Sequence, residues 1–282
     1  MTLKSSVTTT TVGTNRVNFD PLLAIRDVVD GFSRRSLWMA FAIDQIQQRY
    51  RRSRIGFAWI IVSYLIFVGS ISLFFGNFSD LAHRHFTAYV AINYAIFQFL
   101  MANISDGCAV FRSAKTWISS TPLPHSIHVF KSIARSLFVF VVCLIVAFIV
   151  LLVLGQKFSP VALLSIPAFI VLLINAVFIQ ITFGYAAARY RDVDYFMQSI
   201  TRILFFTTPI LWVRDEHMKT GLRLALSEFN PFTHALEIFS SPLLGELPDP
   251  KSWIIIGWLT IANCVIAICV AGVSHRRLAF WL

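Results

Sequence analysis

The sequence predicts an all-α membrane protein with six transmembrane helices, an amphipathic interface helix near the N-terminus, and re-entrant helices on the outer side before the last span. Of the 282 residues, 57% are hydrophobic and only 13% are charged, whereas roughly 25% are charged in average soluble domains. The apolar residues form blocks of about 20, which is the length a helix needs to cross a hydrocarbon core of roughly 30 Å. The net charge of +10 resides in segments that flank these blocks, as membrane topology predicts, and not on one continuous nucleic-acid-binding face.

Residues 1–20 are polar and rich in threonine. They lack the apolar region of a cleavable signal peptide, so we expect a disordered cytoplasmic lead followed by one transmembrane domain over residues 21–282. At its start we expect an interface helix over residues 36–54, because four apolar residues recur there at helical spacing. These residues are Met39, Ile43, Ile46 and Tyr50. Their face can lie on the membrane or pack against protein, and the spacing fits both.

Six apolar blocks are each suited to form a transmembrane helix. They cover residues 56–76, 87–103, 136–154, 161–186, 195–213 and 252–274. Lys and Arg number 17 in the segments that would face inward and 6 in those that would face outward. Because positive residues are retained on the cytoplasmic side, this bias predicts that both termini are cytoplasmic.

The longest inner connection, residues 104–135, contains the run Ser120-Thr121-Pro122-Leu123-Pro124. Two prolines within three residues must interrupt any helix. A short helix beside this break would project into the cytoplasm, where a motor protein could push on it. A simple helical hairpin loop accounts for the same residues.

The outer segment of residues 214–251 is too apolar for an ordinary loop. Asn230 can cap a helix whose first position is Pro231, because Pro is favoured there. We expect this helix over Pro231–Phe239, with residues 218–229 forming a partner helix before it. Two short helices that re-enter the membrane from outside would either gate a channel or form a static plug.

Several enzymatic motifs are absent from the sequence. There is no Gly-Lys dipeptide, so the phosphate-binding loop GxxxxGK[ST] is missing, and neither HExxH nor GxSxG occurs. The 7 histidines and 4 cysteines show no spacing typical of a metal site, so we predict no metal, no disulfide and no cofactor on this chain. None of the 14 acidic residues lies centrally in a predicted span, which argues against a proton-driven mechanism.

Arg202 is the one charge inside a predicted span. It can meet the phosphate or acidic sugars of a passing substrate, or it can extend back to the inner interface. The 27 Phe and 7 Tyr residues include several at helical spacing, whose flat rings are suited to stack on the C–H faces of sugars. The candidates for a channel lining are Tyr64, Phe67, Phe74, Tyr94 and Phe97.

Four segments carry a resemblance to a known family. Residues 49–59 read RYRRSRIGFAW and enter a span that ends at Phe74-Phe75-Gly76. Arg189-Tyr190-Arg191-Asp192 precedes the fifth block, Thr208-Pro209 lies near the outer end of that block, and residues 230–237 read NPFTHALE. In order and spacing these segments resemble the first-span entry, the Arg-Asp turn, the Thr-Pro pair and the Asn-Pro segment of permeases of the polysaccharide and polyol-phosphate ABC exporter family.

The resemblance implies six spans per subunit, a homodimeric pore and two copies of a separate ABC ATPase, which binds ATP and Mg²⁺. It also implies a coupling helix within residues 104–135 and gate helices within residues 214–251. Family members often have a more basic coupling segment that ends in Phe-Pro, whereas this chain has Lys115-Thr116-Trp117-Ile118 and Pro122-Leu123-Pro124. Lys115 and Trp117 are therefore our candidates for contact with the ATPase. The candidate gate residues, beside Arg202, are Asn230, Pro231, Phe232 and His234.

We accordingly expect a permease that exports a lipid-linked polysaccharide, either capsule or O-antigen, across a bacterial inner membrane. The pyrophosphate of an undecaprenyl-linked glycan would meet four cations at the inner leaflet, unless these residues only fix topology. The four are Arg49, Arg51, Arg52 and Arg54. Periplasmic and outer-membrane export components are further expected partners, and nucleic acid is not.

Other function classes are compatible with parts of the sequence. An ABC permease for a drug or a small lipid would share the fold. A membrane glycosyltransferase or acyltransferase would need an acid or base near the membrane face, for which Asp192, Asp194 and His234 are the candidates. A passive channel is disfavoured because nothing in the sequence resembles a selectivity filter.

Overall fold

The computed structural model describes residues 19–51, 53–76, 83–213 and 222–282, and within these ranges the chain forms helices and no strands. In chain order the α-helices are α1 (Pro21–Ser33), α2 (Arg35–Tyr50), α3 (Ala58–Phe75), α4 (His83–Ser113), α5 (Lys115–Ser120), α6 (Ser126–Val153), α7 (Ser165–Arg189), α8 (Asp192–Thr207), α9 (Leu222–Phe229), α10 (Pro231–Leu244), α11 (Pro250–Ser274) and α12 (Leu278–Trp281). Two 3₁₀ helices, η2 (Pro160–Leu164) and η3 (His275–Arg277), precede α7 and α12.

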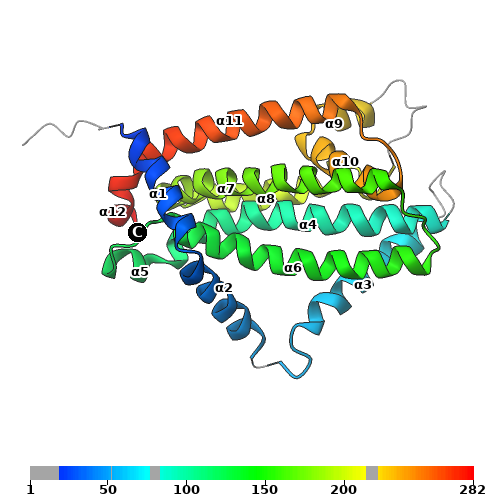
Figure 1. The fold of residues 1–282 in the computed structure, drawn as a ribbon, viewed down its shortest axis with the longest axis horizontal. Coiled ribbons are helices and arrows are strands. Elements are labelled where there is room, and N and C mark those ends of the chain that lie inside the picture. The colour runs from blue at the N-terminus through cyan, green and yellow to red at the C-terminus, as the bar shows by residue number, and fades with distance from the viewer. Residues whose placement is uncertain (1–18, 52, 77–82, 214–221) are drawn as a thin grey trace, which may run out of the picture.

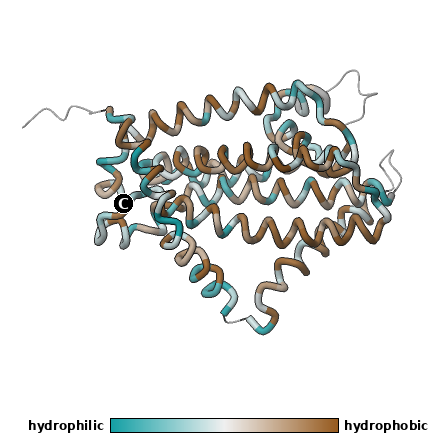
Figure 2. The backbone as a smooth tube through the Cα atoms, viewed as in Figure 1, coloured by the Kyte–Doolittle hydropathy of each residue, from teal (hydrophilic) through white to brown (hydrophobic). Residues whose placement is uncertain are grey.

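In the part of the chain that the structure describes, five helical segments are long and apolar enough to cross a membrane. They are Ala58–Phe75, Arg84–Ser113, Ser126–Val153, Pro160–Arg189 and Pro250–Trp281. Helices α4, α6, α7 and α11 run side by side, while α3 leans away from them (Figure 1). Hydrophobic residues predominate along the middle of the bundle, and hydrophilic residues gather at its two ends (Figure 2). The chain is an all-α membrane protein, as the sequence predicts.

The fifth predicted span, residues 195–213, corresponds to α8, which is shorter than predicted. Its 16 residues reach about 24 Å at about 1.5 Å per residue, less than a hydrocarbon core of roughly 30 Å. The helix ends at Thr207 because Thr208 precedes Pro209 and adopts an extended backbone with ψ 137°. The predicted count of six spans therefore stays a prediction.

The second predicted span, residues 87–103, is part of the much longer α4, which has 31 residues and lies at the centre of the bundle. Its polar residues do not interrupt the helix because their side chains are bonded within it. Asn93 Nδ2 donates to the Tyr89 carbonyl at 2.9 Å, and Asn103 Nδ2 donates to the Phe99 carbonyl at 2.7 Å. Buried alanines such as Ala91 and Ala95 let neighbouring helices approach α4 closely.

The predicted inner connection, residues 104–135, is largely helical. α4 continues to Ser113 and α6 already begins at Ser126, so only residues 114–125 separate the two long helices. We call residues 114–125 the coupling segment. The predicted helix break occurs within it, because Thr121 is extended with ψ 129° and α5 ends at Ser120.

The predicted interface helix, residues 36–54, is shorter in the structure and has two different sides. α2 packs on α6, with Trp38 lying 6.0 Å from Phe130 between ring centroids. On the other side, the side chains of Met39 and Ile43 are 48% and 50% exposed. One side of α2 thus packs on protein, and contact of Met39 and Ile43 with the membrane stays a prediction.

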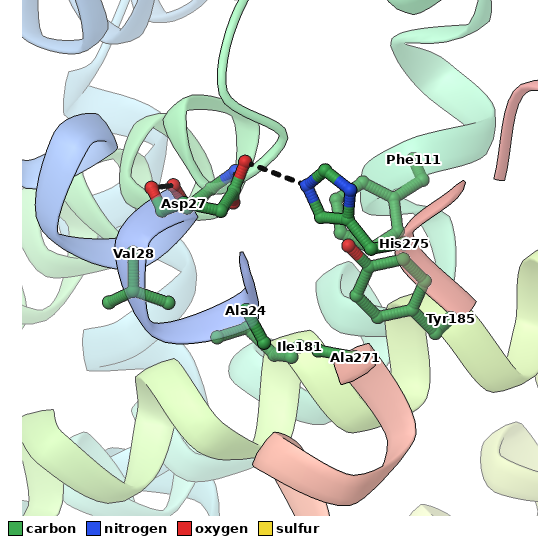
Figure 3. Close-up of a pocket in the computed structure, with 9 residues that line it drawn as sticks. Ala24, Asp27, Val28, Phe111, Ile181, Tyr185, Ala271 and His275 are labelled. Atoms are coloured by element: carbon green, nitrogen blue, oxygen red, sulfur yellow. Dashed lines mark hydrogen bonds and ion pairs between the residues drawn. The ribbon is translucent and has the colours of Figure 1, made fainter. Parts of the chain in front are cut away.

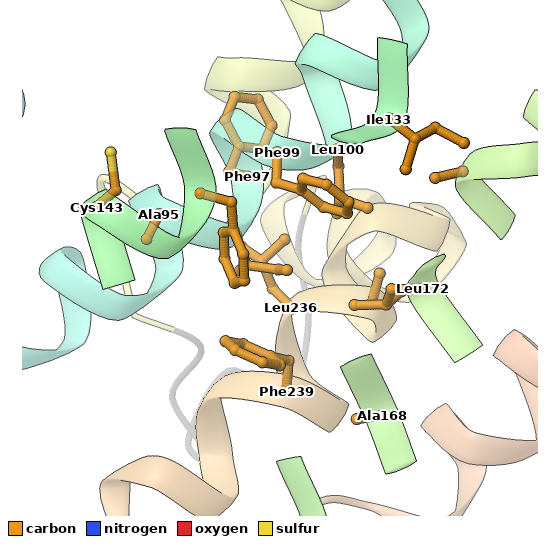
Figure 4. Packing of buried hydrophobic residues seen from close by; sticks show 14 of the residues in the cluster. Ala95, Phe97, Phe99, Leu100, Ile133, Cys143, Ala168, Leu172, Leu236 and Phe239 are labelled. Carbon is orange, nitrogen blue, oxygen red and sulfur yellow. The ribbon is translucent and has the colours of Figure 1, made fainter. Parts of the chain in front are cut away.

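At the opposite end of the bundle, α10 begins where the sequence predicts. The Asn230 side chain accepts a hydrogen bond from the Phe232 N–H, and Pro231 occupies the first helical position. The helix continues to Leu244, beyond the predicted end at Phe239, and Gly245 closes it with φ 92°. Leu236 and Phe239 pack with Phe97, Phe99 and Leu172 of α4 and α7 (Figure 4).

Candidate functional site

The two residues predicted to meet an ATPase both lie on the surface of α5. Lys115 is exposed, and the Trp117 side chain is 51% exposed. One edge of this indole lies against α2, with the Phe41 ring centroid 5.2 Å away. α5 therefore presents a cation and an aromatic ring outward at the end of the bundle that carries both described chain ends (Figure 1).

Beside this segment, the carboxylate of Asp27 joins three parts of the fold (Figure 3). Its Oδ1 accepts hydrogen bonds from the backbone N–H of His125 at 2.8 Å and from Nε2 of His275 at 3.1 Å. Its Oδ2 accepts from the backbone N–H of Ser126 at 2.9 Å. Asp27 lies on α1, His125 and Ser126 lie at the start of α6, and His275 directly follows α11. We call these four residues the Asp27 clamp.

The Asp27 clamp has the composition of a metal site but not its geometry. The ligand-type atoms of Asp27, His125 and His275 lie within 4.8 Å of one another, which is close enough to hold an ion. However, both carboxylate oxygens already accept backbone N–H groups. The two imidazole rings are stacked with centroids 4.3 Å apart and an interplanar angle of 29°, so their in-plane lone pairs do not converge on one point. The arrangement fits a hydrogen-bonded cluster better than a metal centre.

The clamp also shifts the pKa values of its members. Burial alone would raise the pKa of Asp27, but the hydrogen bond and charge of His275, the charge of His125 and the Ser126 N–H outweigh it and leave that pKa below 3.8. Burial lowers the pKa of His125 to about 4, aided by the charge of His275 and opposed by Asp27. The folded protein therefore holds an ionised Asp27 against a neutral His125 at neutral pH.

Acidification from pH 6.5 to about 4 is expected to destabilise this end of the protein. His125 takes up a proton near pH 6.5 in the unfolded chain but only near pH 4 in the folded one, so the unfolded state binds more protons in this interval. The stability due to His125 is complete above pH 6.5 and is lost as the pH falls through 4. Melting temperatures measured across this range in detergent are expected to fall less steeply for His125→Gln than for the wild type. An equally steep fall would contradict the prediction, and His85→Gln, exposed at the other end of the bundle, serves as the control.

Four of the predicted channel aromatics come together where α3, α4 and α8 meet. Phe67 and Tyr94 are stacked with centroids 3.8 Å apart, and Tyr64 also stacks with Tyr94, at 5.8 Å. Phe205 of α8, which the sequence analysis did not single out, lies 5.8 Å from Phe67 and 5.7 Å from Phe97. Tyr64 and Phe97 are buried, while Phe67, Tyr94 and Phe205 are partly exposed. We call these five residues the aromatic cluster.

Two other channel candidates lie outside the aromatic cluster. The Phe74 side chain is 74% exposed near the end of α3. Arg202 is exposed on α8, three residues before Phe205. Its exposed position is compatible with both predicted roles, contact with substrate and extension to the interface.

The predicted headgroup cations lie in the last turn of α2 and in the connection to α3. Arg49, Arg51 and Arg54 are exposed, and Arg52 lies outside the described residues. Exposed apolar side chains adjoin them, with Ile55 at 51% and Phe57 at 56% exposure. Cations beside exposed apolar groups are typical of a membrane–water interface.

His234 of α10, a predicted gate residue, is buried in a polar network that connects α9, α10 and α11. Its Nδ1 lies 2.7 Å from Ser252 Oγ on α11, and its Nε2 donates to the carbonyl of Glu228 on α9 at 3.0 Å. Ser252 Oγ in turn donates to Glu237 Oε2 of α10 at 2.9 Å. Nearby, Asn230 Nδ2 donates to Thr208 Oγ1 at 2.9 Å and ties α10 to the end of α8.

The candidate acids and base of a membrane transferase do not form one site. Asp194, in the first turn of α8, forms an ion pair with Arg112 of α4. His234 lies near the opposite end of α8, because its neighbour Asn230 bonds to Thr208 just past that end. Asp192 is exposed beside Asp194. Nearly the whole length of α8 thus separates the carboxylates from the imidazole, which is far beyond the reach of one proton transfer.

The comparisons with known proteins identify one family. Residues 36–244, which include α2, the coupling segment, the aromatic cluster and α10, match the family described as ABC-2 type transporter. No curated protein matches the chain.

Proposed function

The chain belongs to the ABC-2 type transporter family, and from this premise we propose that it exports a lipid-linked polysaccharide. The family makes it the membrane-spanning permease of an ABC transporter and implies an ABC ATPase as its partner. Two copies of the chain would form a homodimer that provides the path for the polysaccharide. Two copies of the ATPase, binding ATP and Mg²⁺, would supply the energy. Capsule and O-antigen are the proposed cargoes, and a bacterial inner membrane is the proposed location, with both termini cytoplasmic.

The aromatic cluster is the observation that carries the proposed cargo. Phe67, Tyr94 and Phe205 are partly exposed residues on three neighbouring helices. Such rings attract the C–H faces of sugars without forming a fixed ionic bond. This chemistry suits a polymer that must slide past many equivalent positions, and it supports a glycan better than a compact, tightly enclosed drug.

The interface side of α2 supports a lipid carrier. Met39 and Ile43 are exposed on this helix, and Arg49, Arg51 and Arg54 follow at its end. A cation near an anionic membrane surface contributes about 1 kcal/mol. These residues would receive the pyrophosphate of an undecaprenyl-linked glycan at the inner leaflet, and periplasmic and outer-membrane components would receive the polymer beyond it.

The proposal is tested by deleting the gene and measuring surface polysaccharide, with co-purification of the tagged chain as the second measurement. We expect an ATPase in equal amount with the chain, and loss of surface polysaccharide on deletion. An ATPase together with unchanged polysaccharide and increased sensitivity to small toxic compounds would favour the drug or small-lipid alternative. A chain that purifies alone from cells with its native neighbours would overturn the exporter.

Trp117→Ala is expected to separate the chain from its ATPase without preventing membrane insertion. The indole is half exposed on α5. Aromatic side chains that a partner buries contribute a large share of the binding energy at protein interfaces. We expect at least a tenfold loss of co-purified ATPase and a matching loss of surface polysaccharide.

Phe280→Ala provides the matched control for Trp117→Ala. Phe280 is also an exposed aromatic, at 89%, on α12 at the same end of the bundle. It lies outside the coupling segment, so its removal is expected to leave the ATPase bound. Equal losses in the two proteins would contradict a specific role for Trp117.

A further inference from the structure

We propose that Asp27 is a positioning residue that makes the coupling segment move as one body with α1 and the inner end of α11. The inference rests on the proposed function, in which the ATPase pushes on residues 114–125. It concerns how that push reaches the spans, and the residues responsible lie outside the coupling segment itself.

The start of α6 has no side-chain cap of its own. His125 at the N-cap position has helical backbone angles and makes no side-chain capping bond. The first N–H groups of a helix need acceptors, and a carboxylate also interacts favourably with the positive end of the helix dipole. Asp27 supplies that carboxylate from 98 residues earlier in the chain. The beginning of α6 is therefore completed by α1.

The fit between α1 and α6 is also close. Ser126 Oγ donates to the Asp27 carbonyl, so Ser126 bonds both the side chain and the backbone of Asp27. One turn later, a Cβ on Gly31 would lie 2.0 Å from Ser126 Oγ and 3.2 Å from the Ile127 nitrogen. Only glycine fits at this contact, and α1 cannot slide along α6 without breaking the bonds at Asp27.

α1 is connected to the last span as well. His275, at the end of α11, donates to the same Asp27 oxygen that accepts the His125 N–H. A second pair of contacts lies seven residues earlier, about two helical turns away, at the start of α1. The Asp20 N–H donates to the Gly272 carbonyl at 3.2 Å, and Arg276 pairs with the Asp20 carboxylate at 3.2 Å. α1 is thereby fixed to α11 along its first two turns.

A push on α5 consequently has two possible outcomes. Either α1, α6 and the end of α11 move together, or the bonds to the Asp27 carboxylate break and the displacement is lost in the coupling segment. With the Asp27 clamp intact, a displacement of α5 is transmitted directly to α6 and, through α1, to α11, which is far away in sequence.

The test is Asp27→Asn in the full permease–ATPase complex. Asparagine keeps the size of the side chain but replaces one acceptor oxygen with an NH₂ group, which opposes the N–H of either His125 or Ser126. At matched amounts of complex, we expect at least a fivefold drop in surface polysaccharide, while ATP hydrolysis by the purified complex stays within twofold of wild type. Hydrogen exchange at the amides of residues 125 and 126 is expected to accelerate.

Asp30→Asn is the matched control, because Asp30 lies on α1 three residues later and is exposed. It is expected to behave as wild type in all three measurements. His275→Leu, which removes the donor bonded to Asp27 but leaves the α6 cap, is the second variant and keeps the inference testable if Asp27→Asn does not assemble. It is expected to lower polysaccharide at least twofold with unchanged ATP hydrolysis.

Unchanged polysaccharide in Asp27→Asn, or a proportional fall in polysaccharide and ATP hydrolysis, would overturn the positioning role. These outcomes differ from failure of the proposed function, in which the wild-type chain would have no ATPase partner or its deletion would leave surface polysaccharide intact.

Discussion

A protein carrying Gly107→Leu is expected to lose its native helix packing and, with it, all export. Gly107 lies where α4 crosses α7, and a Cβ at this position would be 3.0 Å from the Cα of Gln180. A backbone atom cannot rotate away as a side chain can, so the two helices must separate. Separation would also break the bond from Gln180 Nε2 to Asn103 Oδ1, which is 2.7 Å long and buried.

The expected cost of Gly107→Leu is the sum of two effects. Overpacking costs about 1–3 kcal/mol, and an interhelical hydrogen bond in a membrane protein contributes about 0.6–2 kcal/mol. Size-exclusion chromatography after heating in detergent is expected to show a markedly lower unfolding temperature. Gly257→Leu on α11 is the control, because a Cβ there meets no atom within 4 Å. Equal unfolding temperatures for the two proteins would contradict close packing of α4 on α7.

The second large effect is expected from His234→Leu, which removes the centre of the polar network that joins α9, α10 and α11. The substitution removes the imidazole from the Glu228 carbonyl and from Ser252, and Ser252 is buried, where an unsatisfied polar group costs about 1–3 kcal/mol. Because these bonds join α9, α10 and α11, we expect faster hydrogen exchange in residues 222–252, while α1 and the coupling segment stay protected.

The functional readout of His234→Leu separates a gate from a static plug. A gate loosened in this way is expected to admit small ions through the resting permease, which a conductance measurement in planar bilayers detects. His85→Leu changes an exposed histidine at the same end of the bundle and is expected to have no effect. Fast exchange without conductance would favour the plug.

Local sequence signals predicted local structure well. Asn230 and Pro231 define the start of α10 because capping involves residues two or three positions apart. The two prolines at 122 and 124 likewise place the helix break between α5 and α6. These features need no knowledge of the rest of the fold.

Helix ends were predicted less well where burial or proline decides them. The second span was predicted only over residues 87–103, but Asn93 and Asn103 are each bonded to a carbonyl four residues earlier, so α4 continues through them. The fifth span was extended to residue 213 on hydrophobicity alone, whereas Pro209 forces Thr208 out of the helix.

Residues that act through distant partners could not be found from the sequence. Asp27 is one of several charges near the N-terminus, and nothing local distinguishes it from Asp30. Its partners lie 98 and 248 positions further along the chain. Phe205 was missed for the same reason, because only the packing of α8 against α3 and α4 brings it to Phe67 and Phe97.

The Asp27 clamp also bears on how the protein is made. During synthesis Asp27 leaves the ribosome 248 residues before His275, so this end of the bundle is completed only after the last span has been translated. Until then α1 has no α11 to hold, and Asp20 has neither Gly272 nor Arg276. In a chain truncated before α11, Asp27 would therefore bond only the start of α6, and α1 would lack the contacts that fix it to the last span.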